Sequence, residues 1–223
     1  MATVYEPRED SLLLQTAIRD FFITHPGVQV INALDMGTGS GILAAALCNY
    51  CRDVLAIDVN PEAVDATVIY AQSHHIQNLT VSVSDLFSSV KGSFDLIVFN
   101  PPYLPFDKEQ DAPDIALSPA LPSPKETVED QEQSHLAKED EGIGESENIR
   151  ERIEGNELII RFLKEAKQHL NAKGNILLLF SSLSKPEGIF KSMDQEGYAY
   201  EQLLTQKMFM EELFVYRVWV KAG

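Results

Sequence analysis

Strand-like and helix-like segments alternate through the first hundred residues, and this order constrains the fold more than any other feature of the chain. Four apolar, β-rich segments predict strands, at residues 28–36, 54–59, 79–84 and 94–99. Helix-like segments at 42–50 and 61–74 separate the first three strands. A β-α-β-α order implies a parallel sheet with right-handed crossovers. The last run, FDLIVF, is almost wholly apolar, as expected of a central strand covered on both faces.

The same pattern resumes later in the chain. Apolar residues recur at helical spacing over 157–170, and an apolar run predicts a buried strand at 175–180. Pro186 is expected to open a further helix, and the segment 213–220 (LFVYRVWV) to form the closing strand. A length of 223 residues is that of one α/β domain.

A strongly acidic stretch at 107–154 interrupts this pattern. It holds 15 acidic and 5 basic residues, so it carries −10 of the formal net charge of −16. It begins rich in proline and contains too few apolar side chains to offset the entropy of ordering. We therefore predict one domain over 1–223, with a loosely held acidic loop inserted after the fourth strand.

Composition excludes several classes of protein. An excess of 34 acidic over 18 basic residues argues against binding nucleic acid through its phosphates. No apolar run is long enough to cross a bilayer, and the N-terminus lacks the basic and apolar regions of a secretion signal, so we expect a cytoplasmic protein. Cys48 and Cys51 form a C-x-x-C pair, but no second pair completes a zinc site. We expect reduced thiols and no metal.

A glycine-rich turn, DMGTGSG at 35–41, follows the first predicted strand. Gly37 and Gly39 allow a ligand to approach the backbone, and the helix that follows presents free N–H groups. Asp58 ends the next strand, where a carboxylate accepts both hydroxyls of a ribose, and Asp85 follows the third strand, near an adenine edge. Acids at three successive strand ends suit a ligand with positive charge and no phosphate, which favours S-adenosylmethionine over NAD.

The motif Asn100-Pro101-Pro102-Tyr103 follows the fourth predicted strand directly, at the edge where open α/β sheets bind ligands. The Asn100 side-chain carbonyl and the Pro101 main-chain carbonyl can accept hydrogen bonds from one NH2 group. The prolines hold a rigid, extended turn, and Tyr103 offers a flat surface beside a planar amide or ring. Two such acceptors aim a weakly nucleophilic nitrogen at a methyl-sulfonium and stabilise its developing positive charge.

Three motifs together resemble the HemK family of S-adenosylmethionine-dependent N-methyltransferases: YEPREDS at 5–11, DMGTGSG at 35–41 and NPPY at 100–103. The resemblance is to the short archaeal and eukaryotic branch, which has no N-terminal substrate domain. It implies a Rossmann-like α/β fold with a seven-stranded, mostly parallel sheet that ends in an antiparallel hairpin. The implied reaction is methylation of a glutamine side-chain amide in a protein, with the Gly-Gly-Gln motif of a class I peptide-release factor as the expected substrate.

The resemblance also assigns roles to residues of this chain. Asn100 and Pro101 would hold the target amide within the NPPY turn, with Tyr103 beside it. Leu86 would lie beside the adenine. The residues implied to line the cofactor pocket are Ser11, Asp35, Gly37, Gly39, Asp58, Asp85, Leu86 and Asn100. The acidic insertion replaces a compact segment of the short branch, which affects the expected substrate more than the chemistry.

The short branch also implies a partner. Its members are stabilised by a small zinc-ribbon activator protein that pairs with the edge strand after the second helix, here 79–85. An edge strand with an alternating apolar face is a template for strand addition. We expect a heterodimer of this kind, and the insertion, if it lies near the substrate, would steer a basic partner.

Other acceptors stay open. NPPY also serves N6-adenine methyltransferases, because an exocyclic amine presents the same two hydrogens, although the net charge opposes DNA. A lysine must first lose a proton, and the sequence offers no dedicated base. A non-catalytic module that keeps the cofactor as a structural ligand is a further alternative.

Overall fold

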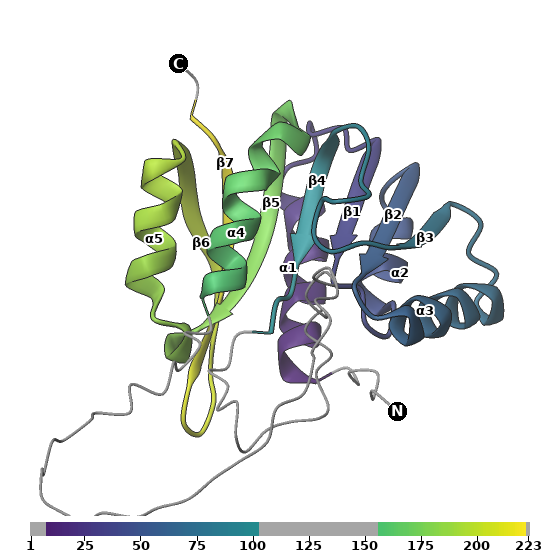
Figure 1. The fold of residues 1–223 in the computed structure, drawn as a ribbon, viewed down its shortest axis with the longest axis horizontal. Helices are drawn as coiled ribbons and strands as arrows, with labels where there is room; N and C mark the ends of the chain where they lie inside the picture. The colour runs from purple at the N-terminus through teal and green to yellow at the C-terminus, as the bar shows by residue number, and fades with distance from the viewer. Residues whose placement is uncertain (1–7, 103–155, 222–223) are drawn as a thin grey trace, which may run out of the picture.

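A seven-stranded sheet with the strand order β3-β2-β1-β4-β5-β7-β6 forms the centre of the protein. The computed structural model describes residues 8–102 and 156–221 (Figure 1). The helices and strands are α1 (Glu9–Thr24), β1 (Asn32–Met36), α2 (Ile42–Cys48), β2 (Asp53–Asp58), α3 (Pro61–Ser73), β3 (Leu79–Val83), β4 (Phe94–Phe99), α4 (Glu157–Ala166), η1 (Lys167–His169), β5 (Leu170–Ser181), η2 (Ser182–Ser184), α5 (Pro186–Gln195), β6 (Tyr198–Lys207) and β7 (Glu212–Val220).

Parallel pairing brings the carboxyl ends of the central strands to one edge of the sheet. Met36 at the end of β1 pairs with Ile57 of β2 on one side and with Phe99 of β4 on the other. Phe99 pairs in turn with Leu178 of β5. The segments that leave β1, β2 and β4 therefore begin side by side, which is the arrangement that builds a ligand site in an open α/β sheet.

Helices cover both faces of the sheet, and the alternating side chains of β4 show the two layers. Leu96 and Val98 are buried in the core cluster that contains α1 and α2. Ile97 and Phe99 are buried in the cluster that contains α4 and α5. A strand buried on both faces needs apolar residues at nearly every position, and in FDLIVF only Asp95, which is partly exposed, departs from this pattern.

Local sequence signals explain where several helices begin. Asn60 caps α3, because its side chain accepts a hydrogen bond of 2.9 Å from the Glu62 amide, and Pro61 occupies the first helical position. In α4 the positions Ile159, Phe162 and Leu163 are fully buried, so one face of this amphipathic helix packs on the sheet.

The predicted fold class is confirmed. The sheet has four parallel strand pairs and two antiparallel ones, β5–β7 and the β6–β7 hairpin. The fourth predicted strand is confirmed over 94–99, and β3 forms an edge of the sheet as expected. The acidic insertion at 107–154 lies outside the described residues, so its order and the domain boundary stay predictions. Within the described ranges, no helix is long and apolar enough to span a membrane.

Three boundaries differ from the predictions by more than two residues. β1 begins at Asn32 rather than at residue 28. At this start the Asp95 carboxylate accepts hydrogen bonds of 2.8 and 3.0 Å from the Ile31 and Asn32 amides. The helix predicted over 157–170 ends at Ala166, and β5 begins at Leu170 rather than at 175. The early part of β5 joins β4 through an irregular register between Phe94 and Leu96, which sequence periodicity does not reveal.

The irregular start of β5 depends on Gly174. A Cβ atom at this position would lie 2.8 Å from the Phe94 carbonyl oxygen and 2.8 Å from Leu170 Cγ. We expect Gly174→Ala to lower the free energy of unfolding by about 1–3 kcal/mol, because backbone must move to admit the methyl group. Gly27→Ala is the control, since nothing lies within 4 Å of its Cβ position, and it should change stability by less than about 0.5 kcal/mol. Urea denaturation of both variants tests this; equal stabilities would contradict it.

Candidate active site

The turn after β1 is shaped by three glycines with left-handed backbone angles. Gly37, Gly39 and Gly41 have φ values of 68°, 53° and 83°. A Cβ atom on Gly41 would also lie 3.0 Å from a methyl carbon of Thr67. The turn is fastened to α3, because the Thr67 hydroxyl donates a hydrogen bond of 3.1 Å to the Gly39 carbonyl. The turn at the carboxyl edge is therefore fixed in a backbone conformation that residues with a Cβ atom rarely adopt.

Asp58, at the end of β2, has one hydrogen bond to each carboxylate oxygen. Oδ2 accepts from the Gly39 amide at 3.0 Å, and Oδ1 accepts from the Asn60 amide at 2.9 Å. Each oxygen of an ionised carboxylate offers two acceptor positions. Asp58 therefore holds the glycine turn and still has one acceptor position on each oxygen for a pair of ligand hydroxyls.

Asp35, in β1, is completely buried, and neither of its oxygens makes a hydrogen bond of ordinary geometry within the described residues. Burial raises the pKa of this carboxyl from its ordinary 3.8 to about 7, and the Thr38 hydroxyl and Ala44 amide offset part of that effect. The charge of Asp58 raises the pKa further. An acid with two unpaired, buried oxygens is well suited to a cationic group, and S-adenosylmethionine carries an ammonium and a sulfonium.

The turn after β3 holds Asp85 and Leu86. Asp85 forms an ion pair with Arg161 of α4, and both side chains are about half exposed. Leu86 is buried and has a φ of 44°, an unusual backbone angle for a residue with a branched side chain. The Ser84 hydroxyl donates to the Leu86 carbonyl at 2.8 Å and accepts from the Ser89 amide at 3.0 Å, which stabilises this angle.

Asn100, directly after β4, is oriented by an acid from α1. Its Nδ2 donates a hydrogen bond of 3.1 Å to Asp10 Oδ2, across 90 residues of sequence. Its Oδ1 is buried and has no hydrogen-bond partner within the described residues. Asp10 is only 4% exposed, and its other oxygen accepts from the Ser11 amide at 2.6 Å. The geometry thus fixes Asn100 with its acceptor oxygen free.

The other predicted site residues are Ser11, Pro101, Pro102 and Tyr103. Ser11 is buried in the first turn of α1, next to Asp10. Pro101 is buried and Pro102 is exposed. Tyr103 lies outside the described residues. The motif at 5–11 places an acid beside Ser11, but nothing in the local sequence indicates that Asp10 is the partner of Asn100.

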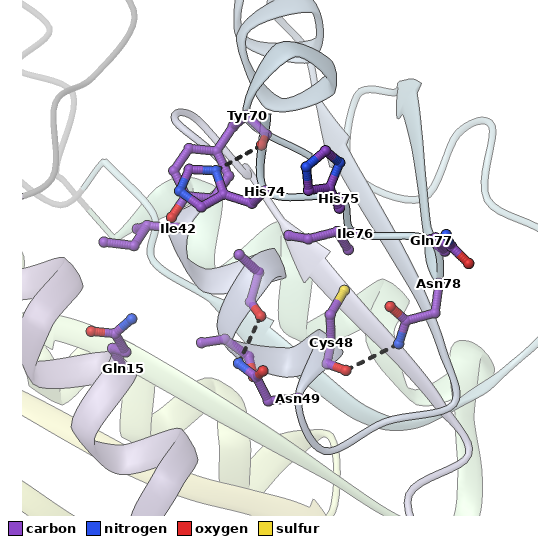
Figure 2. A pocket seen from close by; sticks show the side chains of 12 residues that line it. Gln15, Ile42, Cys48, Asn49, Tyr70, His74, His75, Ile76, Gln77 and Asn78 are labelled. Atoms are coloured by element: carbon purple, nitrogen blue, oxygen red, sulfur yellow. Dashed lines mark hydrogen bonds between the residues drawn. The ribbon is translucent and has the colours of Figure 1, made fainter. Parts of the chain in front are cut away.

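A hollow elsewhere on the surface is not this site. Figure 2 shows side chains that line it from α2, α3 and the segment before β3. Asn78 donates hydrogen bonds of 3.1 and 3.0 Å to the Cys48 and Cys51 carbonyls there. The ends of α2 and α3 lie at the amino edge of the sheet, opposite Asn100.

Burial raises the pKa of Cys48 to about 11 and that of Cys51 to about 12, so both thiols are protonated at neutral pH.

The known proteins that this chain resembles are methyltransferases, which agrees with a site suited to a cationic methyl donor. Residues 19–117 match the family model described as "Methyltransferase small domain". The chain is 30% identical to Methyltransferase HEMK2 of Mus musculus, covering 96% of this chain and 88% of that protein. It is 29% identical to a putative protein N5-glutamine methyltransferase of Methanocaldococcus jannaschii, covering 97% and 91%.

Among solved structures, the fold is similar to that of the E. cuniculi Mtq2-Trm112 complex, which is responsible for the methylation of the eRF1 translation termination factor. The TM-score is 0.63 with 22% identity, and the match covers 99% of this chain and 100% of that one. The similarity to HEMK2 over nearly the whole chain, together with a carboxyl-edge site suited to a cationic methyl donor, shows that this protein belongs to the HemK family of S-adenosylmethionine-dependent methyltransferases.

Proposed function

We propose that this protein transfers a methyl group to the side-chain amide nitrogen of a glutamine in another protein, with a class I peptide-release factor as the substrate. Asn100 carries the proposal. Its amide N–H groups face Asp10, and its Oδ1 is a buried acceptor without a partner within the described residues. A buried acceptor in this state favours a ligand that brings a hydrogen-bond donor, such as an NH2 group.

The names of relatives support glutamine as the acceptor. The Methanocaldococcus relative is named as a putative protein N5-glutamine methyltransferase, and a relative from Streptococcus pneumoniae as a release factor glutamine methyltransferase. A relative from Xanthomonas campestris is named for ribosomal protein uL3. Glutamine is the acceptor named for all three of these relatives, and the release factor and uL3 are the two substrate proteins to compare.

The chain's own residues would position the acceptor. An amide nitrogen is a weak nucleophile because its lone pair is delocalised, so holding it in line contributes much of the rate. Asn100 Oδ1 and the Pro101 carbonyl would each accept one amide hydrogen, and Tyr103 would flank the amide plane. Asp10 would keep Asn100 from rotating its amide, so that an oxygen rather than an NH2 group faces the substrate.

The remaining site residues would hold the cofactor. S-adenosylmethionine supplies a methyl group on a positively charged sulfur. Asp35 would face its ammonium group and Asp58 its ribose hydroxyls. Asp85 and Leu86 would border its adenine, and the residues that line the rest of the pocket would be Ser11, Gly37 and Gly39.

We further propose that a small zinc-ribbon activator adds a strand to β3 and that the heterodimer works in the cytoplasm. Within the described residues β3 has a strand neighbour on one side only. Its last residue, Val83, is 46% exposed. The similar E. cuniculi enzyme was solved as a complex with a second protein, which supports a partner of this kind.

The function is tested by methyl transfer from labelled S-adenosylmethionine. The acceptors are a class I release factor, its Gln→Ala variant at Gly-Gly-Gln, ribosomal protein uL3 and single-stranded DNA, each with and without the activator. We expect label on the wild-type release factor alone. In the same assay Asn100→Ala should lower kcat about 100- to 1,000-fold with cofactor affinity retained. Asn49→Ala, in an exposed position at the end of α2, is the control. Label on DNA, or an unchanged kcat for Asn100→Ala, would contradict the proposal.

The raised pKa of Asp35 predicts a pH-dependent stability. Between pH 3.8 and about 7 the folded protein keeps a proton that the unfolded chain has lost, so stability falls across this window and levels off above it. Asp35→Asn removes the titrating group. The stability of the wild type relative to this variant should therefore decrease as pH rises toward about 7, as measured by urea denaturation without cofactor.

Proton release on cofactor binding gives a second test of the role of Asp35. A cation beside Asp35 favours its ionised form, so binding near pH 7 should release a proton, and Asp35→Asn should release less. Calorimetry in two buffers of different ionisation enthalpy measures the release. Equal proton release by wild type and variant would rule out Asp35 as the partner of the cofactor's charge.

The edge of β3 gives a further prediction. Val83→Asp places a charge on this edge and should weaken binding of the zinc-ribbon activator at least about tenfold, because charged side chains oppose strand addition. Thr205→Asp puts the same charge on an exposed position of β6, at the opposite edge, and should leave binding unchanged. Titration of the activator by fluorescence anisotropy compares the two; equal affinities would place the activator elsewhere.

A further inference from the structure

The turn that joins β6 to β7 holds two large apolar side chains in solvent. Phe209 is 99% exposed and Met210 is 80% exposed, more than any other large apolar residue within the described ranges. Isolated exposed apolar residues are common, but a fully exposed aromatic next to a methionine at the tip of one turn is an arrangement typical of binding surfaces.

The base of this turn is firmly held. The Met208 amide donates a hydrogen bond of 2.8 Å to the Glu211 carbonyl, which closes the turn. The Glu211 carboxylate accepts from the Ser181 hydroxyl at the end of β5. The Glu212 amide donates to the Ser182 hydroxyl at 3.0 Å. Phe209 and Met210 are therefore presented from a fixed base, so the backbone of the turn needs little further ordering on binding.

The turn lies at the same end of the sheet as the candidate active site. Ser181 ends β5, which pairs with β4 through Leu178 and Phe99, and Asn100 follows Phe99 directly. Figure 1 shows the β6–β7 turn extending beyond the sheet at the end where β4 finishes and α1 begins. Leu183, 45% exposed, follows Ser182, whose hydroxyl accepts the hydrogen bond from the Glu212 amide at the base of the turn.

We propose that Phe209 and Met210, with Leu183 beside them, form a docking tip for the protein that carries the target glutamine. This inference rests on the proposed function. A single glutamine side chain offers little surface, so recognition of one protein requires contacts outside the methyl-transfer site. An aromatic and a methionine on a fixed turn suit an apolar depression on a folded protein substrate.

Other occupants suit the tip less well. The acidic segment 107–154 carries a net charge of −10 and contains no Phe, Tyr or Trp, so it is poorly suited to cover the tip. A second copy of this chain would bring another surface of net charge −16, which opposes self-association. The substrate protein is therefore the occupant that position and chemistry favour.

Kinetics provide the first test. The double variant Phe209→Ser/Met210→Ser should raise KM for intact release factor at least about tenfold, with kcat within about twofold and cofactor affinity unchanged. Ile23→Ser is the matched control, because Ile23 is 66% exposed on α1, away from the carboxyl edge, and it should leave KM unchanged. An unchanged KM in the double variant would overturn the docking tip.

Thiol labelling provides a readout that does not depend on activity. A maleimide should react quickly with the Phe209→Cys variant, since both native thiols have raised pKa values and react slowly. Adding release factor should slow the labelling at least about fivefold, whereas adding an unrelated acidic protein should not. Slow labelling in the free protein would mean that another part of this chain or a second copy covers the tip, and would overturn the proposal.

The two experiments separate the possible failures. A wild-type protein that does not methylate the release factor contradicts the proposed function. A wild type that methylates it while the tip variants show normal KM and unprotected labelling contradicts only the docking tip.

Discussion

The hydrogen bond between Asn100 and Asp10 links the two parts of the chain on which the proposed chemistry depends. Asn100 follows a central strand, whereas Asp10 lies in the first turn of α1. α1 is held in place by a fully buried face that includes Leu14, Ile18 and Phe21. Burial of several side chains of this size stabilises a helix position by several kcal/mol, far more than one hydrogen bond. Core packing of α1 thus sets the orientation of the amide in the reaction motif.

The site keeps buried polar atoms that the fold itself does not satisfy. Five buried side-chain polar atoms have no hydrogen-bond partner within the described residues, and one of them, Ser192 Oγ, lies in α5. The other four are both oxygens of Asp35, the Thr38 hydroxyl and Asn100 Oδ1. Leaving such atoms unpaired typically costs about 1–3 kcal/mol each, so a fold tolerates them where a ligand restores the interaction. The four atoms of Asp35, Thr38 and Asn100 lie at the carboxyl ends of β1 and β4, where parallel pairing brings these strands together. Most of the unpaired atoms therefore lie where the topology also places a ligand site.

Local sequence patterns predicted the turns and helix starts that depend only on residues close together in the sequence. The glycine turn could be recognised because left-handed angles at Gly37 and Gly41 require glycine, and the start of α3 because Asn60 and Pro61 act within one turn. The Asp10–Asn100 contact spans 90 residues and the Arg161–Asp85 pair spans 76, so no local pattern encodes them. They exist only because the sheet order places α1 and α4 over the strand ends.

β6 was foreseen only as part of the family's terminal hairpin, because its sequence, YAYEQLLTQK, lacks a clean alternation. A bulged register between Gln202 and Leu204 breaks the period of two that a regular strand shows. The order of strand-like and helix-like segments, by contrast, was enough to predict a parallel α/β sheet, whereas the seven strands and the terminal hairpin came from the family resemblance. Periodicity reports which residues are buried, and it fails where a strand is irregular or lies at an edge.

The two edges of the sheet are unequal in a way that bears on partners. β6 carries Glu201 and Lys207 as well as its bulge, features that protect an edge from pairing with another chain. β3 reads LTVSV, with no charge and no bulge in its pairing with β2. An uncharged edge without a bulge is the kind that accepts an added strand. Because β3 also leads into the turn of Asp85 and Leu86, a strand added there would stabilise one wall of the proposed cofactor pocket while leaving the Asn100 side open to substrate.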